Sequence, residues 1–111
     1  MLSERINWQG KRYVDGNAYV NANDNASAIN LVVSIIVSTL KLNAYASALV
    51  AAVQYIFQAG YVSLYDYVFY SGWVQIGTEY GAWWERYYVD LYADAGHSLY
   101  LRSVFEENFI H

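Results

Sequence analysis

The spacing of apolar and polar residues changes near residue 60, and this change predicts the order of the elements. From Asn25 to about Leu40, polar side chains recur at steps of three and four residues, as they do along one face of an α-helix. After Gly60 the repeat falls to two, which is typical of β-strands. Helices followed by strands, with no alternation between them, favour the α+β class.

The first 22 residues predict extended chain. Asp15-Gly16-Asn17 lies between residues of high β-propensity and has the composition of a tight turn. We therefore expect residues 1–22 to form a short hairpin, or one strand entered from a turn. Asn23-Asp24-Asn25 then offers side-chain oxygens that can cap the start of a helix.

Residues 25–59 predict apolar helices. The polar positions of residues 25–40 form one narrow stripe, so we expect this helix to be central and buried over most of its circumference. Asn43 can cap a second helix over residues 44–58, with Gly60 as its C-terminal stop. One long helix is the alternative, because no Gly or Pro interrupts residues 41–43. We favour the helical hairpin.

Residues 61–109 predict four antiparallel strands in a meander, packed on the helices within one α+β domain over residues 1–111. The expected strands are Tyr61–Tyr70, Trp73–Tyr80, Ala82–Tyr92 and Leu99–Phe109, separated by turns at Ser71-Gly72, at Gly81 and at Asp94–His97. Gly77 is a candidate β-bulge within the second of them.

Strand alternation predicts one face that covers the helices and another that is rich in Tyr and Trp. In Ala82–Tyr92 it separates Trp83, Tyr87, Val89 and Leu91 from Trp84, Arg86, Tyr88, Asp90 and Tyr92; in Leu99–Phe109 it sets Leu99, Leu101 and Phe105 opposite Tyr100, Arg102 and Glu106. Exposed Tyr and Trp give large contact areas at low entropic cost and are frequent in binding hot spots. The expected partner-binding residues are Trp84, Arg86, Tyr88, Asp90, Tyr92, Tyr100 and Glu106.

Composition narrows the classes of function. Charged residues make up 14% of the 111 residues, below the usual ~25%, and 13 tyrosines fill much of the difference. The net charge is −4, and residues 66–111 hold seven acids against two bases. Such a surface repels phosphate backbones, so we expect no direct nucleic-acid binding. The absence of Cys removes disulfides and thiolate metal ligands.

Candidate catalytic chemistry is sparse. His97 and His111 are the only imidazoles and lack metal-ligand spacing, so we expect no metal and no cofactor. Ser98 beside His97 does not make a nucleophile triad. Glu85 with Glu79 or Asp90 is the carboxylate pair closest to a glycosidase layout, but alternation sends Glu85 and Asp90 to opposite faces. We expect a protein that is not an enzyme, with its carboxylates solvating the outer sheet.

The leading hypothesis is a small acidic interaction protein, of the inhibitor or immunity type, that binds a protein partner through the aromatic sheet face. The apolar hairpin at residues 29–57, followed by an aromatic meander, is similar to small exported bacteriocin-type proteins of bacteria, and this resemblance implies a membrane-active alternative. Residues 17–29 (NAYVNANDNASAI) resemble the strand-to-helix entry of small cytosolic phage and bacterial domains. Self-association into a structural or oligomeric protein is the third hypothesis.

The expected compartment is the cytoplasm, and the alternative is secretion with the leader absent from this chain. Residues 1–10 contain no apolar core of a secretory signal. Each half of the hairpin is shorter than the ~20 residues that an α-helix needs to cross a bilayer.

Overall fold

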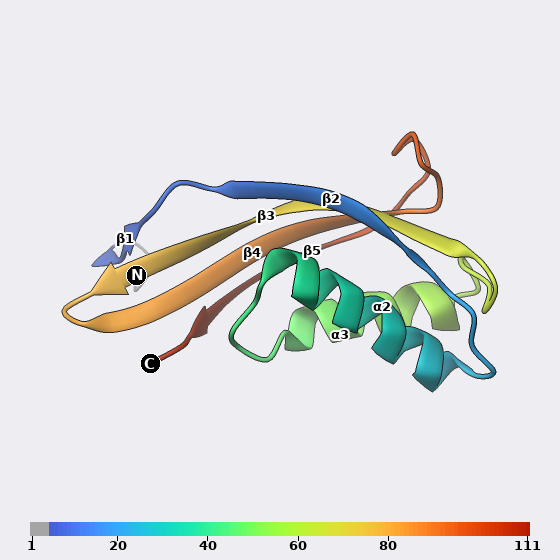
Figure 1. Ribbon diagram of the computed structural model, residues 1–111, viewed down its shortest axis with the longest axis horizontal. Helices are drawn as coiled ribbons and strands as arrows, with labels where there is room; N and C mark the ends of the chain where they lie inside the picture. The colour runs from blue at the N-terminus through green and yellow to red at the C-terminus, as the bar shows by residue number, and fades with distance from the viewer. Residues whose placement is uncertain (1–4) are drawn as a thin grey trace.

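The computed structural model describes residues 5–111. Within this range, two helices lie on one side of an antiparallel sheet of five strands, and none of the described elements covers the other side (Figure 1). The elements in chain order are β1 (Asn7–Trp8), β2 (Arg12–Tyr19), α2 (Asn25–Leu40), α3 (Ser47–Gln58), β3 (Tyr67–Glu79), β4 (Ala82–Tyr92) and β5 (Tyr100–Phe109). The predicted α+β fold and its C-terminal antiparallel meander are confirmed.

The long strand β3 organises the sheet. It pairs with β1 and β2 along one edge and with β4 along the other, and β4 in turn pairs with β5. The end of the sheet that carries the β3–β4 turn and β1 extends past the helices (Figure 1). Strands β2 and β5 therefore form the two long edges.

Helix α2 begins where the sequence predicted. The Asp24 carboxylate caps it by accepting the Ser27 backbone N–H at 2.7 Å, and the helix ends at Lys41 in a left-handed conformation with φ 56°. Its buried residues form one row, Ala28, Val32, Ile36 and Leu40. The expectation of burial over most of the circumference is wrong, because none of the residues 5–111 covers the helix on the side away from the sheet, where Leu31 is 36% exposed.

Two helices, and not one long helix, span the apolar segment. Gly60, with φ 78°, ends α3 in a Schellman motif, in which Gly60 N–H donates to Phe57 and Tyr61 N–H donates to Ile56. The predicted cap at Asn43 is wrong, since α3 starts only at Ser47 and its Ala46 cap supplies no side-chain hydrogen bond. Asn43 lies instead in the linker between the helices.

Two predicted turns are continuous strand. Asp15-Gly16-Asn17 lies inside β2, and Ser71-Gly72 lies inside β3, so the meander has three strands in place of four. Both glycines mark close packing. A Cβ on Gly16 would lie 2.6 Å from the Tyr70 hydroxyl, and a Cβ on Gly72 would lie 2.1 Å from the backbone oxygen of Tyr88.

Of the two other glycine predictions, the turn at Gly81 is confirmed and the bulge at Gly77 is wrong. Tyr80 and Gly81, both with positive φ, make the two-residue connection between β3 and β4, as expected of a primed hairpin turn. The predicted bulge at Gly77 is wrong: its pairing is regular, and the missing Cβ leaves room for the ring of Trp8. The bulge lies in β5 at Leu101, where the register with β4 shifts by one residue.

Polar groups on the sheet hold the helices in place. Glu85, 1% exposed on the helix side of β4, accepts the backbone N–H groups of Asn43 and Ala44 and the Asn43 side-chain amide, all within 3.1 Å. The prediction that the carboxylates solvate the outer sheet is therefore wrong for Glu85. On β2, the Arg12 guanidinium donates to the backbone oxygen of Leu40 at the end of α2.

Glu106 of β5 supplies the N-terminal cap that α3 lacks. Its carboxylate accepts the Ser47 hydroxyl at 2.7 Å, the Ala48 backbone N–H at 3.3 Å and the Tyr87 hydroxyl at 2.6 Å. The Tyr87 oxygen in turn accepts the Leu49 N–H at 3.1 Å. Two strands thus supply acceptors for the Ala48 and Leu49 N–H groups in the first turn of the helix.

Because the cap is a carboxylate, it makes the free energy of unfolding depend on pH in the acidic range. Burial raises the pKa of Glu106, but hydrogen bonds from Tyr87, Ser47 and Ala48 lower it by more, so that the pKa lies below the ordinary 4.5. The contribution of Glu106 to stability is therefore complete above about pH 4.5, and it is lost as the pH falls through the lower pKa of the folded state.

We expect the free energy of unfolding to fall less steeply below about pH 4.5 in Glu106→Gln than in the wild type. Urea titrations at a series of acidic and neutral pH values measure this slope. Gln54→Ala, a change at an exposed residue of α3 that removes no titratable group, should keep the wild-type slope. Parallel curves for wild type and Glu106→Gln would show that the cap carries no such linkage.

Among residues 5–111, no helix combines the length and the apolar character needed to cross a bilayer.

Candidate functional site

The candidate site is the side of the sheet opposite α2 and α3, which we call the outer face. Along β4, Glu85, Tyr87, Val89 and Leu91 point to the helices and are buried, whereas the alternating residues between them are half-buried. The outer face comprises Tyr13, Asp15, Asn17 and Tyr19 of β2; Tyr67, Phe69, Ser71, Trp73 and Gln75 of β3; Trp84, Arg86, Tyr88, Asp90 and Tyr92 of β4; and Tyr100, Ser103, Phe105, Glu107 and Phe109 of β5.

One aromatic row crosses four strands of the outer face. Tyr13 pairs with Trp73, Trp73 with Tyr88, and Tyr88 with Phe105. The Trp73 and Tyr88 rings lie 6.1 Å apart and within 17° of parallel, and Phe105 meets Trp73 at 6.2 Å and 60°. Tyr13 is 72% exposed and Phe105 is 49% exposed, so the two ends of the row are open to a partner, and Trp73 and Tyr88 between them are half-buried.

A second aromatic row lies toward the chain reversal between β4 and β5. Phe69 pairs with Tyr92, and Tyr92 pairs with Tyr100, whose ring centre is 6.1 Å away. The His97 ring stacks on Tyr92 at 4.4 Å and 4°. His97 is thus held as an aromatic neighbour of the outer face.

Between the two rows runs a polar row made of Asp15, Ser71, Asp90 and Ser103. One oxygen of Asp90, Oδ1, accepts the Tyr88 hydroxyl at 2.7 Å and also the Ser103 hydroxyl. The Ser103 bond lowers the pKa of Tyr88, but the bond to Asp90, burial and neighbouring charge raise it by more, so this phenol stays a donor at neutral pH.

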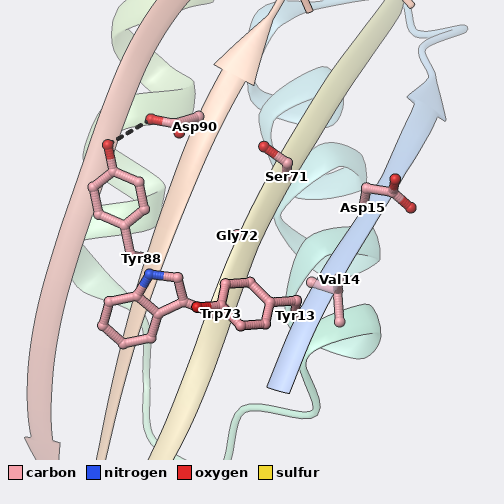
Figure 2. A pocket seen from close by; sticks show the side chains of 8 residues that line it. All are labelled: Tyr13, Val14, Asp15, Ser71, Gly72, Trp73, Tyr88 and Asp90. Atoms are coloured by element: carbon pink, nitrogen blue, oxygen red, sulfur yellow. Dashed lines mark hydrogen bonds between the residues drawn. The ribbon is translucent and has the colours of Figure 1, made fainter. Parts of the chain in front are cut away.

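The polar row opens into a shallow depression of about 460 Å³ (Figure 2). Tyr13, Trp73 and Tyr88 form its aromatic wall, and Asp15 and Asp90 lie on the strands to either side of Ser71. Its lining contains no basic residue.

The cations of the outer face are already engaged. Arg86 donates to Gln75 at 2.7 Å, pairs with Glu107 at 3.3 Å, and lies 4.1 Å from the ring centre of Trp8. Lys11, beside the first aromatic row, holds its ammonium 4.3 Å from the ring centre of Trp73. These contacts show that the rings of this sheet accept cations against their faces.

The structure brings together six of the seven residues predicted to bind a partner. Trp84, Arg86, Tyr88, Asp90, Tyr92 and Tyr100 all lie on the outer face. Glu106 does not, because the bulge at Leu101 adds one residue to β5 and reverses the alternation after it. Phe105 therefore points outward, and Glu106 points to the helices, where it caps α3.

Sequence reasoning missed the contribution of β2 and β3 to the same face. Tyr13, Asp15 and Trp73 lie there because both strands run straight through the segments that were expected to turn. The signal was the alternation of Tyr13, Asp15, Asn17 and Tyr19, which becomes visible only if Gly16 is accepted as a strand residue.

The candidate catalytic groups do not assemble. Asp94 accepts the backbone N–H groups of Ser98 and Leu99, which holds the β4–β5 turn. The Ser98 hydroxyl also donates to Asp94, and this bond, together with the backbone hydrogen bonds, lowers the pKa of Asp94. Glu85 and Asp90 lie on opposite faces, as alternation predicted. Within the described range, no group of three His, Cys, Asp or Glu residues is arranged to hold a metal ion.

Comparisons of this chain with protein families, with curated proteins and with solved structures found no match. The function of the outer face is therefore inferred from its geometry and chemistry.

Proposed function

We propose that this protein is a non-catalytic binding protein, of the inhibitor or immunity type, whose outer face engages another protein. The observation that carries the proposal is an aromatic face, built from four strands, that lies opposite α2 and α3 and that the described residues leave open. Soluble proteins seldom leave such aromatic area uncovered without a binding role. Tyr100, Phe105 and Phe109, at 49–58% exposure, extend this surface to the β5 edge.

The residue types favour a protein partner. Tyr, Trp and Arg are the side chains most enriched in binding hot spots, and the outer face offers all three around a polar centre. Cross-strand packing holds the rings in place before binding, which lowers the entropy lost on association. The apolar rows of α2 and α3, by contrast, are buried against the sheet, so the membrane-active alternative would require the fold to open.

Photo-crosslinking tests the proposal. A photoreactive phenylalanine analogue is placed at Phe105 on the outer face and, in a matched control, at Gln54, which is exposed on α3. In cells of the source organism we expect a crosslinked partner from position 105 and none from position 54. Equal yields from both positions would contradict the proposal. Crosslinks from position 105 only to further copies of this chain would assign the face to self-association.

A further inference from the structure

We propose that two copies of this chain join edge to edge, with β2 of one copy paired antiparallel to β2 of the other about a two-fold axis at Gly16. Two independent observations carry the proposal. The backbone of β2 has unpaired hydrogen-bonding groups along its free side, and its sequence is complementary to itself. The inference goes beyond the proposed function, because it concerns an edge of the sheet and not the outer face.

Strand β2 is a free edge of the sheet (Figure 1). It pairs with β3 on one side, and no described element pairs with its other side. The Val20 N–H donates to the Asp66 oxygen at 2.7 Å in the same register, so the even-numbered residues of β2 are those that bond to β3. The N–H and C=O groups of the odd-numbered residues therefore point to the free side. These residues are Tyr13, Asp15, Asn17 and Tyr19, and all four are exposed.

Strand β2 lacks the features that commonly keep an edge from pairing. Such features are a bulge, a Pro or a Lys within the strand. The register of β2 with β3 is regular from Arg12 to Tyr19, and that segment contains neither Pro nor Lys. The other long edge, β5, carries a bulge at Leu101. Of these two edges, β2 is therefore the one suited to accept a further strand.

The sequence of β2 indicates that the further strand is a second copy of itself. The residue types on the two sides of Gly16 match: Asp15 and Asn17 flank it, Val14 and Ala18 come next, and Tyr13 and Tyr19 are outermost. An antiparallel copy centred on Gly16 therefore places each residue opposite one of similar size and chemistry. The two-fold axis makes every such pair occur twice.

On the outer face, this register pairs Tyr13 with Tyr19 of the second copy and Asp15 with Asn17. Cross-strand aromatic pairs stabilise antiparallel sheets, and the Asn17 amide can donate to the Asp15 carboxylate. No two carboxylates lie directly opposite each other. Because these are the residues with free backbone groups, each pair also exchanges two backbone hydrogen bonds, about eight in the dimer.

On the helix side, the join between the two strands is lined by small residues, Val14, Gly16 and Ala18. Gly16 has no room for a side chain, since a Cβ there would lie 2.6 Å from the Tyr70 hydroxyl. Pairs without hydrogen bonds bring the two Cα atoms of an antiparallel ladder to about 4.5 Å, and small residues fit this spacing. The result is one continuous sheet with the helices of both copies on the same side.

The dimer joins the outer faces of the two copies. The aromatic row that contains Trp73 and Tyr13 continues into Tyr19 of the second copy. In each copy, the Tyr19 ring already contacts Tyr67, with ring centres 4.9 Å apart. The partner-binding surface thus extends across both copies.

Sedimentation velocity over a concentration series measures the association. We expect the sedimentation coefficient of the wild type to rise from that of a monomer to that of a dimer between about 1 μM and 1 mM. A protein that remains monomeric over this whole range would overturn the proposal.

Charge at position 17 tests whether the dimer forms through β2. Asn17→Asp sets a carboxylate opposite each Asp15 and should weaken the dimer about tenfold, whereas Asn17→Lys sets an ammonium there and should strengthen it about threefold or more. Gln54→Asp and Gln54→Lys make the same changes in net charge at an exposed position of α3 and should change the dissociation constant by less than about twofold. Equal effects at positions 17 and 54 would contradict a β2 join.

A mixture of two cysteine variants tests the register. The chain has no cysteine, so Tyr13→Cys and Tyr19→Cys each introduce a single thiol. In the proposed register, positions 13 and 19 of different copies lie opposite each other with a Cα separation of about 5.5 Å, which suits a disulfide. Two copies of position 13 lie about 20 Å apart, as do two copies of position 19.

In a glutathione redox buffer, we expect a disulfide-linked dimer from the mixture and none from either variant alone. Circular dichroism spectra like that of the wild type show that each variant is folded. Crosslinking that is no greater in the mixture than in the separate variants would overturn the register.

The dimer and the proposed function fail separately. Phe105 lies on β5, at the opposite edge of the sheet from β2, so the photoreactive group at position 105 does not lie at the join between the copies. A monomer that still crosslinks a partner from position 105 would remove the dimer and leave the proposed function intact. A dimer that yields no such crosslink would do the reverse.

Discussion

Glu85→Ala should lower the free energy of unfolding by about 3 kcal/mol, the largest effect that we expect from removing a single polar group. The Glu85 carboxylate is 1% exposed and accepts three N–H donors from the linker between α2 and α3. Without it, the backbone N–H groups of Asn43 and Ala44 lose their acceptor in a part-buried position. The linker then loses its attachment to β4.

Urea unfolding followed by tryptophan fluorescence measures this loss. Glu107→Ala is the matched control, because Glu107 makes a partly exposed ion pair with Arg86 on the outer face and should cost less than about 1 kcal/mol. Glu85→Gln keeps one oxygen acceptor and should fall between the two. A Glu85→Ala protein as stable as Glu107→Ala would show that the linker does not depend on this carboxylate.

Gly72→Ala should be about as damaging, at about 3 kcal/mol or more, for a steric reason. A Cβ at Gly72 would lie 2.1 Å from the backbone oxygen of Tyr88 and 3.1 Å from Cα of Val89, so β3 and β4 would have to separate. Their pairing forms the centre of the sheet, and no side-chain rotation can relieve a clash with backbone atoms.

Gly10→Ala is the control for Gly72→Ala, because no heavy atom lies within 4 Å of a Cβ built at Gly10. Its unfolding free energy should stay within about 0.5 kcal/mol of the wild type. Thermal melts followed by circular dichroism compare the two variants. If Ser71-Gly72 were an exposed turn, both substitutions would be tolerated, and equal melting temperatures would contradict the continuous strand.

Helix α2 and strand β4 were predictable because the spacing of their apolar residues matches the side of each element that the fold buries. Helix α2 spans Asn25–Leu40 and β4 spans Ala82–Tyr92, both as the sequence predicted. The buried residues recur every four positions in α2 and every second position in β4, as the apolar residues of the two sequences do. The prediction of central burial for α2 went too far, because apolar composition does not reveal how many layers cover a helix.

The false turns have a common physical origin. Gly is used both where the chain must turn and where another group must approach closely, and the sequence around it is the same in both cases. At Gly16 the approaching group is the Tyr70 side chain, and at Gly72 it is the backbone of β4. Both contacts are set by strand pairing over long sequence separations, which no local pattern encodes.

The residues of the outer face were predicted correctly where strand alternation is unbroken, and wrongly where a bulge interrupts it. All five of the β4 residues predicted to bind a partner lie on that face, whereas the bulge at Leu101 moved Glu106 to the other side. The burial of Glu85 had a signal: it shares the alternation of Tyr87, Val89 and Leu91. Its charge argued for exposure, but the unpaired N–H groups of the helix linker supply the partners that make its burial favourable.

The most direct test of the binding role of the outer face is the crosslinking yield from position 105 in two double variants. Tyr88→Ala/Tyr92→Ala removes two rings from the outer face, and Tyr45→Ala/Tyr61→Ala removes two exposed rings elsewhere. With both proteins folded, we predict that the yield falls at least tenfold in the first and is unchanged in the second. An unchanged yield in Tyr88→Ala/Tyr92→Ala would contradict the assignment of this face as the binding surface.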